Sequence, residues 1–134
     1  MDGVVSVGDD LVPHSLSEML QRTSIEEQLH ALTAGLPMAR AVLVTHAPPY
    51  GTVCDVAHGH RHVGSRGLRA FIEQRQPLFG LHGHIHETVD LSGSFVERIG
   101  RTQCAAVGND HRLDRPWVLE VELGEEPVVR RVRI

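Results

Sequence analysis

Two short apolar runs, each followed by histidine, constrain most strongly what this chain can fold into. Residues 41–45 (Ala-Val-Leu-Val-Thr) form the first run, and His46-Ala-Pro-Pro follows it. Two prolines cannot continue a β ladder, so we expect a strand that ends at His46. Residues 78–81 form the second run, followed by His-Gly-His-Ile-His at 82–86. An all-apolar strand is usually buried on both faces, so the pattern predicts two buried strands with histidines at their ends.

Helices are expected before and between these strands. Ser24 and Glu27 have the spacing of a capping box, which predicts a helix start. Its apolar residues recur at intervals of four, three and four, and we expect this stripe to face the core: Ile25, Leu29, Leu32 and Leu36. Ser65 is expected to cap a second helix that ends before Pro77. Its predicted buried residues are Leu68, Phe71 and Ile72, and its predicted outward residues are Arg66, Arg69, Glu73 and Arg75.

The rest of the chain is dominated by predicted strands. Runs of β-prone residues at 95–99, 102–107, 117–123 and 128–134 are separated by glycine-containing turns and predict an antiparallel tail. At the start, residues 4–7 predict a strand followed by a turn at 8–10, and Ser15 is expected to cap a short helix through Gln21. The predicted class is α/β (α+β), with helices early and antiparallel strands last.

Length and composition exclude several classes of protein. A chain of 134 residues with 41% hydrophobic side chains predicts one domain over residues 1–134. No apolar run is long enough for a membrane span and no signal peptide is recognised, so we expect a cytoplasmic protein. The net charge of −4 is well mixed along the chain, so nucleic-acid binding is not indicated. Cys54 and Cys104 have no metal-binding spacing and are expected to be reduced.

The histidines carry the chemical signal. Seven of the ten lie between positions 46 and 86, and such clustering suggests metal binding. His46, His84 and His86 stand at the ends of the two predicted strands beside glycine, where imidazoles can be held rigidly. The isolated histidines are interpreted as ordinary solvated residues: His14, His30 and His111.

Three segments in a fixed order resemble the calcineurin-like metallophosphoesterases. They are residues 44–52 (Val-Thr-His-Ala-Pro-Pro-Tyr-Gly-Thr), 62–73 and 81–87 (Leu-His-Gly-His-Ile-His-Glu), and the similarity extends from about residue 41 to 107. The resemblance implies a four-layer α/β/β/α sandwich with mixed sheets and a dinuclear metal centre at the strand ends. It also implies that His46 and His84 bind one metal ion and that His86 binds the other.

The implied cofactors are two divalent ions, Mn, Fe or Zn, which would polarise a phosphate ester and supply a bridging hydroxide. In this family the loop after the first histidine borders the active site, so the resemblance makes Asp55 and His62 candidate substrate-binding residues. A polar surface loop that simply turns at its glycines is the other interpretation of this segment.

The family's upstream blocks, which contain Asp-x-His, Gly-Asp-x-x-Asp and Gly-Asn-His, are not found before His46. Asp9 does not restore the second block, and Asn109 is interpreted as part of a turn rather than as a displaced ligand. We therefore expect an N-terminally truncated, C-terminal portion of a phosphoesterase. Weak metal binding and little hydrolysis of phosphate mono- or diesters are expected from it alone. The alternative is a non-catalytic remnant that binds a partner or associates with itself, because half of a sandwich exposes a sheet face or edge.

Overall fold

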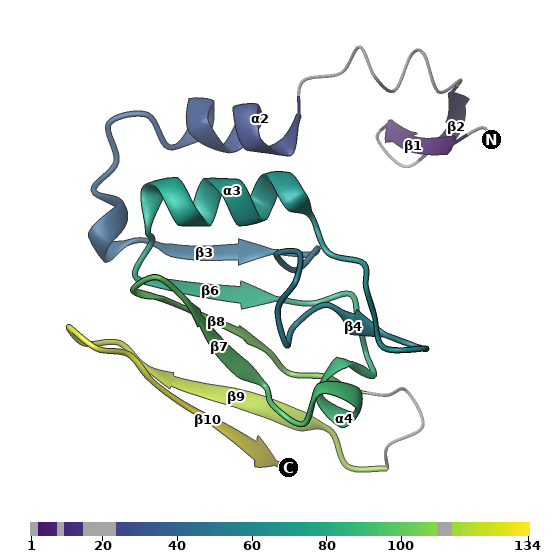
Figure 1. The fold of residues 1–134 in the computed structure, drawn as a ribbon, viewed down its shortest axis with the longest axis vertical. Coiled ribbons are helices and arrows are strands. Elements are labelled where there is room, and N and C mark those ends of the chain that lie inside the picture. The colour runs from purple at the N-terminus through teal and green to yellow at the C-terminus, as the bar shows by residue number, and fades with distance from the viewer. Residues whose placement is uncertain (1–2, 8–9, 15–23, 110–113) are drawn as a thin grey trace.

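A four-stranded mixed sheet forms the centre of the protein (Figure 1). The computed structural model describes residues 3–7, 10–14, 24–109 and 114–134. The strand order is β3-β6-β8-β7, in which β3 (Val42–Thr45), β6 (Phe79–His82) and β8 (Thr102–Ala106) are parallel. β7 (Val96–Ile99) pairs antiparallel with β8. The chain is therefore mixed α/β with a mixed sheet, as the sequence predicts at this coarse level.

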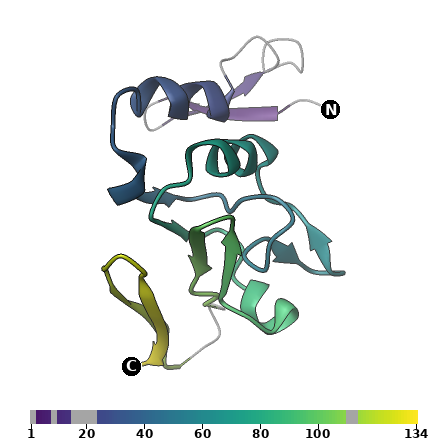
Figure 2. The same cartoon turned by 60° about the vertical axis from the view of Figure 1, so that its left-hand side comes forward.

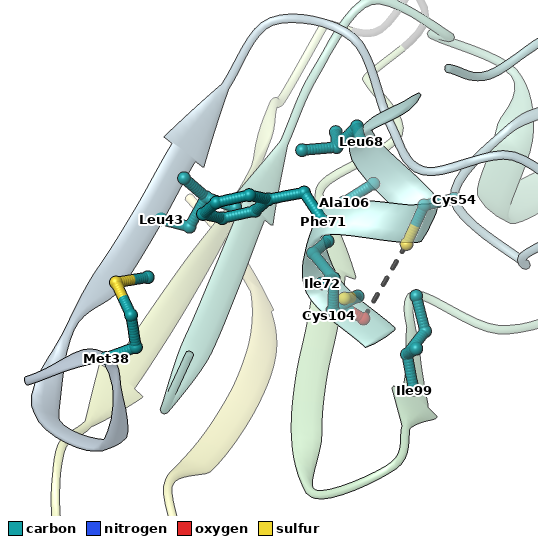
Figure 3. Packing of buried hydrophobic residues seen from close by; sticks show 9 residues of the cluster. All are labelled: Met38, Leu43, Cys54, Leu68, Phe71, Ile72, Ile99, Cys104 and Ala106. Carbon is teal, nitrogen blue, oxygen red and sulfur yellow. Dashed lines mark hydrogen bonds between the residues drawn. The ribbon is translucent and has the colours of Figure 1, made fainter. Parts of the chain in front are cut away.

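Helix α3 (Arg66–Arg75) covers one face of this sheet and contributes three residues to the core (Figures 1 and 3). Ser65 caps it by accepting a hydrogen bond from the amide of Leu68, and it ends at Gln76, before Pro77, as predicted. Its three predicted inward residues are fully buried. They pack with residues of β3, β7, β8 and the connecting segments in one cluster: Met38, Leu43, Cys54, Leu68, Phe71, Ile72, Ile99, Cys104 and Ala106.

Helix α2 (Ile25–Leu32) begins as predicted but buries much less of its apolar stripe than expected. Both hydrogen bonds of the Ser24–Glu27 capping box are present. The helix packs on α3 rather than on the sheet, and only Leu29 of the stripe packs against the main core. Leu32 is 77% exposed, and Leu36 lies beyond the helix end with 53% exposure. The predicted core-facing stripe is thus correct only for Leu29 and wrong for Ile25, Leu32 and Leu36, because α2 lies outside α3 in the described part of the chain.

The first apolar strand is also less buried than its composition predicts. β3 lies at the edge of the sheet, and of its residues only Leu43 is buried. Val44 is 72% exposed and Val42 is 37% exposed, because their face of the edge strand has no covering element among the described residues. The prediction that this strand is buried on both faces is therefore wrong for β3. For β6 it is nearly correct, since Phe79, Gly80 and His82 are buried and Leu81 is half-buried.

The C-terminal strands match their predicted bounds to within one residue. β9 (Trp117–Glu122) and β10 (Val128–Arg133) form an antiparallel pair of their own. Side chains fasten this pair to the main sheet: Gln103 donates to the carbonyl of Pro127 (2.7 Å), and Arg131 donates to the carbonyls of Val107 and Gly108. Figures 1 and 2 show the pair beside β7 and β8.

Several short elements are not predicted by the sequence patterns. They are β2 (Asp10–His14), the 3-10 helix η1 (Met38–Arg40), the small β4 (Val56–Ala57) and β5 (Arg61–His62) pair, and α4 (Thr88–Ser92). β2 pairs with β1 (Gly3–Val7), which confirms the expected first strand. The predicted helix at 15–21 lies outside the described residues, as does most of the turn at 8–10. No helix in the described ranges has the length and apolar character needed to cross a bilayer.

Candidate functional site

The candidate site lies where β3 and β6 end. The two strands are parallel neighbours, and the register places Thr45 beside His82. The next residues, His46 and Gly83, therefore emerge at the same edge of the sheet, and the Gly83 amide donates to the His46 carbonyl (3.1 Å). The carboxyl edge of parallel strands is where open α/β sheets most often place functional groups.

His46 and His84 come together at this edge. Nδ1 of His84 lies 2.9 Å from Nε2 of His46, and the rings meet edge to face with centroids 4.8 Å apart. Both side chains are exposed, and His84 has a positive φ of 71°, which few non-glycine residues adopt. With metal–nitrogen bonds of about 2.0–2.1 Å, nitrogens at this separation subtend roughly 90° at an ion, as neighbouring ligands of an octahedral site do. The separation therefore matches that of two adjacent ligand nitrogens, while in this structure the contact is a hydrogen bond between the two rings.

His82 has a structural position between the two strand ends. It is buried with 5% exposure, and its Nδ1 lies 2.8 Å from Oγ1 of Thr45. Because the Thr45 hydroxyl donates to the Ala47 carbonyl (2.7 Å), the imidazole Nδ1–H must donate to Thr45. Burial lowers the pKa of His82 to about 4, so the ring is neutral at pH 7. Its Nε2 has no hydrogen-bond partner among the described residues.

His86 lies two residues beyond His84, and both histidines border a pocket of about 240 Å³ together with Asn109. The described residues contain no group of three or more His, Cys, Asp or Glu side chains able to hold a metal ion. Of the three predicted ligands, the structure thus pairs His46 with His84 and leaves His86 outside that pair. The amide side chain of Asn109 is used elsewhere, because it donates to the Trp117 carbonyl and accepts from the Trp117 amide.

Asp55 and His62 form a second pair in the loop after His46. The Asp55 carboxylate is fully buried, and it accepts hydrogen bonds from the amides of Gly51, Thr52 and Gly64 and from Nδ1 of His62 (2.6 Å). Burial acts to raise the pKa of Asp55, but the hydrogen bonds from His62 and the three amides outweigh it, and the net pKa is lowered. The ionised carboxylate therefore organises the loop. His62 is 42% exposed, so of the two it is the residue within reach of a substrate.

Tyr50 and Arg66 extend this second pair along the surface. The rings of Tyr50 and His62 lie 6.0 Å apart, and the Arg66 guanidinium lies 3.7 Å from the Tyr50 ring centroid. Arg66 is exposed, as predicted, but it stacks on an aromatic ring instead of projecting freely. The motif containing Tyr50 was the available sequence signal for this contact. The position of Tyr50 relative to Arg66 depends on the loop that connects β3 to α3, in which Ser65 pairs with Pro49.

Cys54 and Cys104 are free and buried, and burial raises the pKa of both thiols, that of Cys104 to about 12. Both thiols are therefore protonated and unreactive. Asp9 and His111 lie outside the described residues. His30 contacts the ring of Phe71 edge to face, with centroids 5.1 Å apart.

Comparison with known proteins identifies two longer relatives. The chain is 31% identical over 105 residues to the UPF0046 protein K07C11.7 of Caenorhabditis elegans, which covers 78% of this chain and 35% of that protein. It is 39% identical over 64 residues to the uncharacterized protein MJ1162 of Methanocaldococcus jannaschii, covering 45% of this chain and 27% of that protein. No family model and no solved structure matches the chain. The chain thus spans about a third of the length of the curated relatives it matches.

Proposed function

We propose that this chain carries the histidine ligands of a metal-dependent phosphoesterase of the calcineurin-like class, within a four-layer sandwich. The observation that supports the proposal best is the approach of His46 Nε2 and His84 Nδ1 to 2.9 Å at the carboxyl edge of two parallel strands. Imidazole nitrogens are ligands that suit Mn, Fe or Zn ions. In this proposal His46 and His84 hold one ion, and His86 contributes to a second.

The chemistry assigned to the bound ions is polarisation of a phosphate mono- or diester and supply of a hydroxide nucleophile. The chain's own residues position that chemistry. The Thr45–His82 hydrogen bond and the Gly83–His46 hydrogen bond hold the ends of β3 and β6 together. They therefore fix the backbone positions from which the His46 and His84 side chains project. His62, oriented by Asp55, is the candidate residue for contact with the substrate.

Low activity is expected from the 134-residue chain by itself. Two imidazoles leave most coordination positions of an ion to other ligands, and none of the described carboxylates joins them. The matched relatives are about three to four times as long as the region they share with this chain, and we propose that additional ligands belong to a longer parent protein. A parent of this kind would act on a phosphoester as its small-molecule or macromolecular substrate.

Metal binding at the strand ends tests the proposal directly. Mn²⁺ is added to the ¹⁵N-labelled chain, and the imidazole signals of His46 and His84 are expected to broaden before those of other histidines. His84→Ala is expected to abolish the effect at His46, whereas the exposed His58→Ala is the matched control and should leave it intact. Broadening that is equal at all exposed histidines would contradict the proposed site.

Hydrolysis is tested separately with bis-nitrophenyl phosphate and added Mn²⁺. We expect little or no release of nitrophenol above the metal-only background. Robust turnover that is lost in His84→Ala would confirm the phosphoesterase assignment and overturn the expectation of an incomplete site. Turnover that persists in His84→Ala and in His46→Ala would show that the activity does not come from this pair.

A non-catalytic, self-associating module is the second candidate function. It is favoured by β3, which lies at the edge of the sheet with Val44 72% exposed and Val42 37% exposed. An unpaired strand edge with exposed apolar side chains is a template for another copy of the same strand. If this candidate is correct, light scattering will show a dimer that Val44→Arg converts to a monomer. A monomer with a well-ordered core would contradict it.

A further inference from the structure

One pocket lies at the opposite end of the sheet from the histidines. It has a volume of about 650 Å³ and is bordered by the start of the β3 segment, the β7–β8 turn and the β9–β10 turn. Figure 1 shows these segments together at the end of the molecule from which the β3 and β6 arrows point away. The volume is within the range of small-molecule sites. Nothing in the proposed phosphoesterase chemistry uses this edge.

Three arginines from separate segments border this pocket. Arg40 is the last residue of η1, Arg98 belongs to β7 and Arg101 lies in the β7–β8 turn. The protein as a whole is acidic, with a net charge of −4, so this grouping does not follow from a generally basic surface. Guanidinium groups are planar donors whose paired N–H groups match carboxylate and phosphate oxygens.

Arg101 is held in place before any ligand binds. Its backbone amide donates to Oε1 of Gln76 (2.7 Å), and its Nε and Nη2 donate to the Gln76 carbonyl (3.2 and 2.8 Å). Gln76 is itself fixed in the left-handed region (φ 48°) at the end of α3. A side chain added at Gly100, which has φ 60°, would place its Cβ against the Gln76 amide group. The turn is therefore built around one preorganised guanidinium.

The other two arginines remain available. The guanidinium of Arg40 is exposed and makes no hydrogen bond or ion pair with another described side chain. Within the part of the chain that the structure describes, the Arg98 guanidinium makes only long contacts, 3.5 Å to the Arg101 carbonyl and 3.7 Å to the Glu126 carboxylate. Glu126 is 84% exposed, so this ion pair is weak and easily exchanged for another anion. Glu125 also borders the pocket, which leaves three positive side chains and two negative ones.

Apolar side chains complete the lining. Leu78, Leu123 and Pro127 border the same pocket, and Leu123 is 57% exposed. The turn that carries Pro127 is anchored by the buried hydrogen bond from Gln103, so this wall is fixed to the main sheet. Apolar lining with a few convergent charged groups is the common composition of sites for organic anions.

We propose that this pocket binds a small organic anion, with its phosphate or carboxylate group between Arg40, Arg98 and Arg101 and its apolar part against Leu78 and Leu123. The proposal is independent of the phosphoesterase assignment, because it involves neither the histidines nor a metal ion. Phosphate and carboxylate share the recognition chemistry, and the experiment separates them.

The test is a titration of the ¹⁵N-labelled 134-residue chain in EDTA, with phenyl phosphate, benzoate and inorganic phosphate as separate probes. Saturable shifts are expected at the amides of Gly100, Arg101 and Leu123 and at the Nε–Hε signals of the three arginines. Phenyl phosphate is expected to bind more tightly than inorganic phosphate if the apolar wall contributes. Benzoate binding as tight as that of phenyl phosphate would identify the carboxylate as sufficient.

Three pocket variants and one control variant define the result. Arg40→Gln and Arg98→Gln are expected to weaken the affinity for phenyl phosphate about three- to tenfold, because each removes a charged donor. Glu126→Gln is expected to tighten it about twofold, since it removes a negative charge and frees Arg98. Arg130→Gln, at an exposed position on β10 outside the pocket, is the matched control and should change nothing. Arg101 is left intact because it also holds the turn to Gln76.

Three outcomes would overturn the proposal. They are the absence of saturation at these signals up to several millimolar probe, equal binding by Arg40→Gln and Arg130→Gln, and shifts confined to the histidine edge. The last outcome would leave the phosphoesterase proposal supported while removing this one, so the two proposals fail separately.

Discussion

The hydroxyl of Thr45 and the imidazole of His82 join the ends of β3 and β6 through a hydrogen bond of 2.8 Å. His46 follows Thr45 directly, and His84 lies two residues after His82. Nδ1 of His84 lies 2.9 Å from Nε2 of His46. His82 is therefore a buried support for the exposed histidine pair, although it belongs to the same short His-Gly-His-Ile-His segment as His84.

Protonation of His82 is expected to destabilise the fold between about pH 6.5 and pH 4. Burial lowers the folded-state pKa to about 4 from 6.5, so in this window the unfolded chain binds a proton that the folded chain does not. The free energy of unfolding therefore falls as the pH falls, by up to about 3 kcal/mol at the lower end. Urea unfolding at several pH values measures this, and His82→Gln should flatten the curve. His58→Gln, at an exposed histidine, is the control and should keep the wild-type dependence of the free energy of unfolding on pH. The same dependence in His82→Gln would contradict the assignment of this effect to His82.

Gly80→Ala is expected to destabilise the protein by about 1–3 kcal/mol through overpacking. An added Cβ would lie 2.7 Å from Nε2 of His82 and 3.4 Å from Sγ of Cys104, inside the core. Gly124→Ala is the matched control, because the nearest atom to its Cβ is the Glu126 carbonyl oxygen at 3.7 Å. Chemical denaturation of both variants provides the measurement. Equal stability of the two variants would show that the His82 ring does not fill this space.

Asp55→Asn is expected to cost about 2–4 kcal/mol of stability. The carboxylate is fully buried and accepts four hydrogen bonds, so an amide group would direct N–H donors at backbone N–H donors. The lowered pKa of Asp55 also means that its contribution is present above about pH 4 and is lost as the pH falls through the folded-state value.

Asp55→Asn should therefore unfold with a shallower dependence on pH in this acid range. His62→Ala is expected to cost less than about 1 kcal/mol, because His62 is 42% exposed. A larger loss from His62→Ala than from Asp55→Asn would contradict the view that the carboxylate organises the loop.

His84→Gly is expected to be more stable than His84→Ala by about 1 kcal/mol, because only glycine adopts the positive φ of 71° without strain. Both variants should lose the effect of Mn²⁺ on His46. Thermal unfolding compares the two, and a more stable alanine variant would show that residue 84 leaves the left-handed region. If the prediction is correct, the backbone strain at His84 is retained for the position of its ring rather than for stability.

Local patterns in the sequence were sufficient to predict most of the secondary structure. The capping box at Ser24, the cap at Ser65 and the stop before Pro77 depend on neighbouring residues alone, and the structure contains all three. The same is true of the C-terminal strands, whose alternation and turn residues are local. α4 and the β4–β5 pair were not predicted, because they are too short to show a period and depend on contacts such as that of Val56 with Thr88.

The sequence by itself determined which histidines stand at strand ends, because apolar runs and the residues that stop them are adjacent in the chain. Only the tertiary structure decided which of those histidines meet. His82 continues the alternation of β6 into the core, whereas the left-handed backbone of His84 brings its ring back to His46. Burial was likewise decided by position in the sheet: β3 is as apolar as β6 but lies at the edge, so Val44 remains in contact with solvent. Pairing between distant segments depends on strand order and backbone geometry, which the local pattern does not contain.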